Sequence, residues 1–221
     1  MVAAGVSAVR SLPTLQTPSC VRYVSKRVFD LSVATTGLIL LLPVLLLIAL
    51  AVRIDSKGPA IFRQDRVGRF GVVFRIHKFR TMKADHSRGG SLITVDRDPR
   101  ITRVGHVLRR LKLDELPQLF DVLAGDMSIV GPRPEVPEYV AIYPAGLRDQ
   151  ILSIRPGITD EASILVRDES RLLGNAADPQ RLYVEEIMPR KLELCARYAA
   201  THTFLGDLRI IGRTIGFFFR E

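Results

Sequence analysis

Two adjacent acidic residues, Asp114 and Glu115, are the strongest candidates for chemistry in this chain, and they lie in the segment LKLDELPQLFDVL. The apolar spacing predicts that they stand at the start of a short helix, where the positive end of the helix dipole keeps a carboxylate ionised. An ionised aspartate can act as a nucleophile or bind Mg²⁺. The structural alternative is that Asp114 is a helix N-cap and Glu115 a first-turn acid, with Pro117 tolerated in that turn. The residues alone leave both interpretations open.

Arginines near this dyad could bind a phosphate. Arg109 and Arg110 precede it by about one helical turn, and Arg133 lies in the turn GPRP, where two prolines fix its backbone. A guanidinium group suits phosphate because it offers paired donors in one plane. Arginines on amphipathic helices also simply face water or lipid headgroups, and that is the preferred account of Arg110.

Lys78 and Arg80 alternate with Phe79 at the end of a predicted strand, so both side chains can point toward one anionic site. A solvated strand edge is the plain alternative. The four histidines never fall at metal-ligand spacing and the two cysteines, Cys20 and Cys195, fit no zinc motif, so we expect reduced thiols and no zinc. No Walker loop, GxGxxG turn or GxSxG elbow occurs, and a nucleotide would have to be held in another way.

The elements that must position these residues begin with a long apolar segment. The chain is uncharged from Leu31 to Val52. A helix of that length reaches about 33 Å, close to the hydrocarbon thickness of a bilayer, which favours a membrane helix over a buried core helix. Both flanks are basic, and Pro43 near the middle removes a backbone hydrogen bond. A helix that enters, breaks at Pro43 and returns to the same leaflet fits both observations, and a kinked span is the alternative.

The remaining segments predict a small domain that is mainly helical. Residues 1–25 carry no acidic residue and no long apolar run, which indicates a loosely ordered extension. The segment from Ala60 to Arg80 has two runs rich in Val, Ile and Phe around VGRFG, which predicts a β-hairpin. Apolar spacing between Ile101 and Gly125 predicts two short helices joined at Lys112–Asp114. GPRPE and RPGITD are predicted turns, and MPRKLELCARYAATH and FLGDLRIIGRTIGFFF predicted helices.

The composition limits the partners. A chain of 221 residues is long enough for one domain with a hydrophobic core. Its net charge of +9 indicates anionic partners such as lipid headgroups, phosphorylated substrates or nucleic acid. Nucleic acid is not expected, because there is no recognition motif and a long apolar helix is committed to lipid. A non-catalytic membrane adaptor that docks on anionic lipid is the alternative to an enzyme.

Several blocks taken together resemble the bacterial sugar transferase family, the monotopic phosphoglycosyl transferases. They are KRVFDLSVATTGLILLLPVLLLIAL, GPAIFRQDRVGRFG, FRIHKFRTM, LRRLKLDELPQLFDVLAGDMSIVGPRPE, IRPGITD and DLRIIGRTI. The resemblance covers about residues 26–221 and is most specific through LDELPQ and DMSIVGPRPE. It implies an α+β, mainly helical fold: a re-entrant membrane helix over 26–58 broken at Pro43, and a small cytosolic catalytic domain over 59–221 with a short β-hairpin and amphipathic interfacial helices.

The resemblance also implies a reaction. Asp114 would attack the β-phosphate of a UDP-sugar, form a phosphosugar–enzyme intermediate and release UMP. Polyprenyl (undecaprenyl) phosphate would then accept the phosphosugar by a ping-pong route, which initiates exopolysaccharide, capsule, O-antigen lipopolysaccharide or glycoprotein glycan assembly. Glu115 would be the partner of Asp114, and the two carboxylates would hold Mg²⁺. The implied phosphate-binding residues are Arg109, Arg133, Lys78, Arg80 and Arg155.

The resemblance places the chain on the cytoplasmic face of the cell inner membrane, as a monotopic protein. A homodimer is compatible with the sequence, which does not specify the oligomeric state. Two departures from the family pattern matter. Leu42 precedes the helix-breaking proline, where members often carry a serine, and Asp160 and Glu161 replace the glycine and glutamine common after GIT. The identity of the donor sugar therefore cannot be carried over from a relative.

Overall fold

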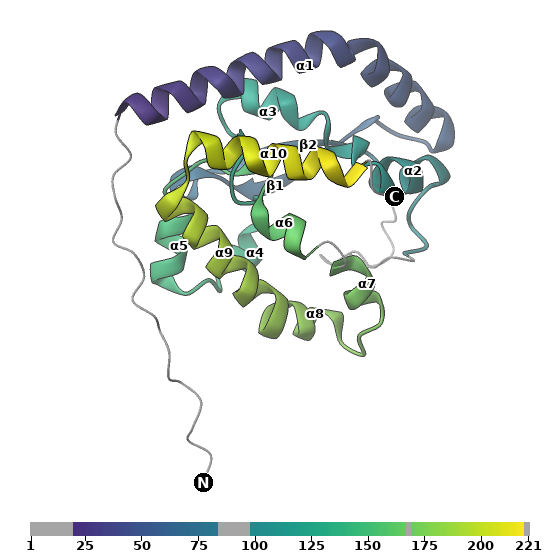
Figure 1. Ribbon diagram of the computed structural model, residues 1–221. Helices are drawn as coiled ribbons and strands as arrows, with labels where there is room; N and C mark the ends of the chain where they lie inside the picture. The colour runs from purple at the N-terminus through teal and green to yellow at the C-terminus, as the bar shows by residue number, and fades with distance from the viewer. Residues whose placement is uncertain (1–19, 84–97, 167–168, 219–221) are drawn as a thin grey trace.

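The long helix α1 (Cys20–Asp55) arches over the rest of the chain in the computed structural model, which describes residues 20–83, 98–166 and 169–218 (Figure 1). Helical structure continues past Pro43, so this residue lies inside α1 and does not end it. Most of the extension predicted over residues 1–25 lies outside the described residues. Residues 20–25 already belong to α1.

One face of α1 packs on the domain and the other is exposed. Buried residues recur at helical spacing, namely Ala34, Leu38, Leu45, Ile48 and Val52. The opposite face exposes large apolar side chains, namely Ile39, Leu40, Leu42, Leu46, Leu47 and Leu50. Within the described ranges, this is the one helix long and apolar enough to cross a membrane. A continuous apolar surface of this size is typical of a contact with lipid or with a partner protein.

Both ends of α1 are fixed to the same domain. Near its start, Lys26 pairs with the buried carboxylate of Asp207, with 2.7 Å between Nζ and Oδ2. At its end, Asp55 Oδ2 accepts a hydrogen bond from the backbone nitrogen of Val104, at 3.0 Å. The helix therefore lies along the surface of the domain. It does not extend away from the domain with only one end attached.

The predicted hairpin is confirmed. Strands β1 (Ile61–Val67) and β2 (Val73–Phe79) pair antiparallel through the 3₁₀ turn η1 (Arg69–Gly71), in a register that sets Ile61 opposite Phe79. Phe74, Ile76 and Phe79 are buried in the larger of the two hydrophobic cores, which also receives the packed face of α1. The hairpin is thereby held against the underside of α1.

The two short helices predicted between Ile101 and Gly125 are confirmed as α2 (Arg103–Arg110) and α3 (Gln118–Ala124). Between them lies a separate 3₁₀ turn, η2 (Leu113–Glu115), entered through Lys112 in the left-handed region at φ 54°. The expectation that the dyad opens the second helix is therefore wrong. Asp114 and Glu115 precede α3, because the left-handed residue redirects the chain and α3 begins only after Pro117.

Two segments predicted as turns lie side by side. Strand β3 (Ser128–Val130) pairs parallel with β4 (Gly157–Thr159), and the extended GPRPE segment follows β3. The backbones approach so closely that a Cβ added at Gly157 would lie 2.1 Å from the backbone nitrogen of Gly131. Glycine is required at this crossing. The short strand pair fixes the start of the segment that carries Arg133.

The rest of the chain is helical. The elements are α4 (Pro137–Val140), α5 (Ala145–Ile151), α6 (Glu161–Leu165), α7 (Glu169–Gly174), α8 (Pro179–Leu182), the π-helical turn η3 (Tyr183–Ile187), α9 (Met188–Thr201) and α10 (Phe204–Phe218). Helices α9 and α10 confirm the two predicted C-terminal helices. A second hydrophobic core forms around α9, with Tyr139, Ile151 and Leu192 among its buried residues. The mainly helical fold with a short hairpin is confirmed.

Candidate active site

Asp114 presents a carboxylate oxygen that the described part of the chain leaves without a partner. Its Oδ1 is buried and has no hydrogen-bond partner among the residues that the structure describes. Burial raises the pKa of Asp114, and the negative charge of Glu115 adds to that effect. This direction is opposite to the one expected from a helix dipole, and Asp114 lies in η2, ahead of the helix that begins at Gln118. A carboxylate held this way is available to a ligand.

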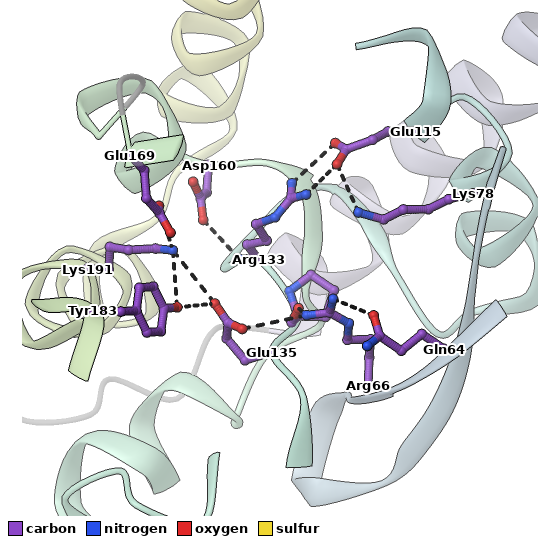
Figure 2. Close-up of polar contacts among 11 residues, drawn as sticks. Gln64, Arg66, Lys78, Glu115, Arg133, Glu135, Asp160, Glu169, Tyr183 and Lys191 are labelled. Atoms are coloured by element: carbon purple, nitrogen blue, oxygen red, sulfur yellow. Dashed lines mark hydrogen bonds and ion pairs between the residues drawn. The ribbon is translucent and has the colours of Figure 1, made fainter. Parts of the chain in front are cut away.

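Glu115 is occupied by two cations, as Figure 2 shows. Its Oε1 accepts a hydrogen bond from Lys78 Nζ at 3.0 Å, and its two oxygens accept from both terminal nitrogens of Arg133, with Oε2 3.2 Å from Nη1. Burial alone would raise the pKa of Glu115, but the charges of Arg133 and Lys78 hold it well below its usual range. Glu115 is thus a buried anion that fixes two cations beside Asp114.

The two cations respond differently to this environment. Burial lowers the pKa of Lys78 to about 8, while the charge of Glu115 opposes that shift. The charge of Glu115 raises the pKa of Arg133, against the effect of burial. The backbone nitrogen of Arg133 also donates to Asp160 Oδ2 at 2.9 Å, which fixes its main chain (Figure 2). The guanidinium of Arg133 is therefore permanently charged. The ammonium of Lys78, with its pKa lowered to about 8, loses its proton at a lower pH than an ordinary lysine.

Three of the predicted phosphate-binding residues lie near the dyad. Lys78 and Arg133 contact Glu115 directly, and Arg109 is half-buried in the last turn of α2, where its charge acts to lower the pKa of Asp114. Three elements, β2, α2 and the GPRP turn, therefore bring positive charge to the Asp114–Glu115 dyad in η2.

Arg80 and Arg155 make their contacts elsewhere. Arg80 is 7% exposed and its guanidinium donates to the carbonyl oxygens of Val52, Ser56 and Lys57, at 3.3, 2.6 and 2.9 Å, so it caps the end of α1. Arg155 donates through Nε to the carbonyl of Gly125 at 2.6 Å and through Nη1 to the hydroxyl of Tyr23. A role for either residue in binding the donor stays a prediction.

A buried network behind the GPRP turn was missed by reasoning from the sequence. Glu135 accepts a hydrogen bond from the Tyr183 hydroxyl at 2.7 Å, and its carboxylate lies 3.6 Å from Arg66 and 3.7 Å from Lys191 (Figure 2). Arg66 also donates to the carbonyl of Pro134 at 3.0 Å. The network ties the turn that carries Arg133 to β1 and α9. Glu135 is adjacent to the turn in sequence, but its partners are too distant along the chain to be found by spacing.

His77 and Asp121 form a second contact that the sequence did not reveal. Asp121 is 2% exposed and lies 2.6 Å from His77 Nδ1 and 3.0 Å from the backbone nitrogen of His77. The pair joins β2 to α3. Because His77 precedes Lys78, this contact sets the position from which Lys78 reaches Glu115.

In the dyad, Asp114 Oδ1 is a buried carboxylate oxygen with no hydrogen-bond partner among the described residues, and it is available to Mg²⁺. They contain no group of three or more His, Cys, Asp or Glu side chains able to hold a metal. Magnesium in phosphoryl-transfer enzymes is bound by one or two carboxylates together with substrate phosphates. Asp114 Oδ1 fits that role. Glu115 fits it less well, because binding a metal would displace Arg133 or Lys78.

A family model described as "Bacterial sugar transferase" matches residues 21–221 of the chain. The chain is 39% identical over 202 residues to the UDP-glucose:undecaprenyl-phosphate glucose-1-phosphate transferase of Caulobacter vibrioides, covering 86% of this chain and 68% of that protein. It is 43% identical over 162 residues to the Escherichia coli protein of the same name, covering 72% of this chain and 35% of the relative. It is also 39% identical over 150 residues to the UDP-N-acetylgalactosamine-undecaprenyl-phosphate N-acetylgalactosaminephosphotransferase of Aeromonas hydrophila, covering 67% of this chain and 36% of the relative. The chain thus spans about a third of the length of the last two relatives.

Proposed function

The chain belongs to the bacterial sugar transferase family, and we propose that it transfers a sugar-1-phosphate from a UDP-sugar to undecaprenyl phosphate and releases UMP. The single observation that carries the proposal is the unpartnered, buried oxygen of Asp114 beside the cations that Glu115 fixes. Relatives named for glucose and for N-acetylgalactosamine transfer share similar identity with the chain, so the donor sugar is left open.

The proposed reaction has two displacements at one phosphorus atom. The Asp114 carboxylate attacks the β-phosphorus of the UDP-sugar; a bond forms between the carboxylate oxygen and phosphorus, and the bond from phosphorus to the bridging oxygen breaks with its electrons leaving on UMP. A phosphate oxygen of the lipid acceptor then attacks the same phosphorus, and the bond to Asp114 breaks. The carboxylate is regenerated and the product is a lipid diphosphate sugar.

The surrounding cations stabilise charge during these steps. Phosphoryl transfer depends mainly on alignment and on neutralising the charge of the phosphate oxygens. Arg133 supplies a permanent positive charge beside the dyad, Lys78 supplies a second in its protonated form, and Arg109 adds a third. Glu115 serves as the anchor that holds the first two in place. Asp114 would hold Mg²⁺, which would supply further neutralisation of charge on the donor phosphates.

The function is tested with the purified protein in detergent, undecaprenyl phosphate, Mg²⁺ and a panel of UDP-sugars. We expect UMP release with one donor or a small subset, at a rate at least tenfold above that with the other nucleotide sugars. The readout is UMP, with a UMP-coupled assay checked against chromatography. If no donor in the panel gives UMP above a protein-free blank, while a relative of known activity prepared in the same way does, the proposal is wrong.

We propose further that α1 enters and leaves the membrane on the cytoplasmic face of the inner membrane, so that the domain lies at headgroup depth. Three observations support this: both ends of α1 contact the same domain, the outward face is apolar, and basic residues flank both ends. Because both ends of α1 contact the same domain, a helix that crossed the membrane would have to place one of these contacts on the opposite side from the domain.

This topology predicts the labelling of two cysteine tags. In a background without Cys20 and Cys195, Val24→Cys and Lys57→Cys place exposed thiols near the two ends of α1. In intact cells, we expect neither tag to react with a membrane-impermeant maleimide added from outside. Both should react after permeabilisation, which is the positive control. Labelling of one tag in intact cells would instead indicate a helix that crosses the membrane.

A further inference from the structure

A second group of cations lies near the start of α1, in a pocket that we define by Tyr23, Arg27, Arg69 and Arg155 and name the Tyr23 pocket. Arg69 and Arg155 both donate to the hydroxyl of Tyr23, Arg69 at 3.1 Å. Their guanidinium carbons lie 5.0 and 5.3 Å from the centre of the Tyr23 ring. One tyrosine thus holds two arginines together.

The Tyr23 pocket is distinct from the candidate active site. Arg27 donates to the carbonyl of Val122 at 2.8 Å, and Arg155 donates to the carbonyl of Gly125 at 2.6 Å, so both arginines lie at the C-terminal end of α3. Asp114 precedes the N-terminal end of the same helix, which spans about 10 Å. A ligand in the pocket therefore lies at the opposite end of α3 from the proposed nucleophile.

The Tyr23 pocket has more positive than negative charge in its lining. In the part of the chain that the structure describes, no carboxylate pairs with Arg27, Arg69 or Arg155, whose donors meet carbonyl oxygens and the Tyr23 hydroxyl. Asp30, the one acid in the pocket lining, accepts hydrogen bonds from Ser128 and Ile129, and Asp207 pairs with Lys26. The pocket lining therefore holds three guanidinium groups and one carboxylate, that of Asp30. This excess of positive charge indicates a site for an anion.

The hydroxyl of Tyr23 strengthens this indication. Its oxygen accepts two N–H donors, so its own proton is directed to a third group. Tyr23 is 37% exposed and donates no hydrogen bond within the described ranges, so this proton is available to a ligand or to water. An anion between the two arginines would accept it, together with the guanidinium hydrogens that the carbonyl oxygens leave unused.

The surface beside the pocket identifies the source of the anion. Val24 and Val28, on the same end of α1, are 52% and 58% exposed. A hydrocarbon chain attached to a bound phosphate can lie along this apolar strip, whereas a free phosphate gains nothing from it. We propose that the Tyr23 pocket binds the phosphate of an anionic phospholipid, separately from the reacting lipid. This inference rests on the membrane position proposed above.

The test is the thermal unfolding of the full chain in neutral detergent with added lipid. We expect phosphatidylglycerol at saturation to raise the unfolding midpoint by about 5 °C, and phosphatidylcholine or inorganic phosphate to leave it within about 1 °C. The double variant Arg69→Gln/Arg155→Gln should lose most of the shift. Arg69→Lys/Arg155→Lys, which keeps the charge, should retain part of it, and it serves as the reporter if the glutamine variant does not fold.

The matched control removes the same charge at a distance. Arg181→Gln/Arg190→Gln changes two exposed arginines of α8 and α9, and Figure 1 places α8 on the side of the domain away from α1. This control should keep the full shift. An equal shift with phosphatidylcholine or inorganic phosphate, or an undiminished shift in the glutamine variant, overturns the proposal. A shift with UDP that the glutamine variant loses would assign Arg155 to the donor site instead. UMP release by the same wild-type preparation separates these outcomes from a failure of the proposed function.

Discussion

Asp114→Asn should lower UMP release from the true donor by about 10³-fold or more, because the amide cannot form the bond to phosphorus. The change keeps the size and shape of the side chain. It also removes the charge that burial disfavours, so the variant should be at least as stable as the wild type. The measurement is UMP formed per enzyme in detergent, alongside the thermal unfolding midpoint of the same preparation.

The control for this substitution is Asp149→Asn, because the Asp149 side chain is 76% exposed and forms only a surface ion pair. Its UMP release should equal that of the wild type. The covalent step has its own readout: with donor present and acceptor withheld, mass spectrometry should find a sugar-phosphate adduct on the peptide that contains Asp114. Unchanged turnover in Asp114→Asn would remove the nucleophile assignment, and absence of the adduct from trapped wild-type enzyme would remove the ping-pong route.

Much of this fold follows from local patterns. The Val, Ile and Phe runs around VGRFG predict the hairpin because alternation and a glycine-containing turn are short-range signals. The helices α9 and α10 follow from apolar stripes at helical spacing. The start of α3 could not be predicted from apolar spacing, because the left-handed conformation of Lys112 inserts a separate turn before Pro117. Apolar spacing alone cannot reveal one residue with positive φ.

The candidate site was predictable in part. Asp114 and Arg133 stand out because of their residue types and the motifs around them. The function of Glu115 as an anchor was not predictable, because it depends on Lys78 and Arg133 arriving from β2 and from the segment after β3. Arg80 shows the converse: its alternation with Lys78 indicates a shared anionic site, but its guanidinium is used to cap α1. Spacing indicates which residues share a face, whereas tertiary packing decides what that face meets.

Glu115→Gln should cost about 3–5 kcal/mol of stability and lower the unfolding midpoint by roughly 10 °C. The amide keeps the shape of the side chain but leaves Arg133 and Lys78 without the anion that both contact. UMP release should fall about 10²-fold, with a higher KM for the donor, because Arg133 is no longer held in one orientation. The matched control is Glu185→Gln, which breaks an exposed pair with Arg181 and should leave the unfolding midpoint nearly unchanged.

The pH dependence of this difference has a definite sign. The folded-state pKa of Glu115 is depressed, so its contribution to stability is fully present above the unfolded-state pKa of about 4.3. The contribution is lost as the pH falls from there toward the lower folded-state pKa. The unfolding midpoints of the wild type and Glu115→Gln should therefore differ by a constant amount near pH 7 and converge below about pH 4.

The same variant separates an anchor from a metal ligand. If Glu115 held Mg²⁺, Glu115→Gln would raise the Mg²⁺ concentration needed for half-maximal UMP release and would cost little stability without metal. If Glu115 holds Arg133 and Lys78, the loss of stability persists in chelator and the Mg²⁺ requirement changes little. We expect the second result, because both oxygens of Glu115 already accept from cations whereas Asp114 Oδ1 has no partner in the described part of the chain. A metal ion would therefore reach Asp114 without breaking an existing ion pair.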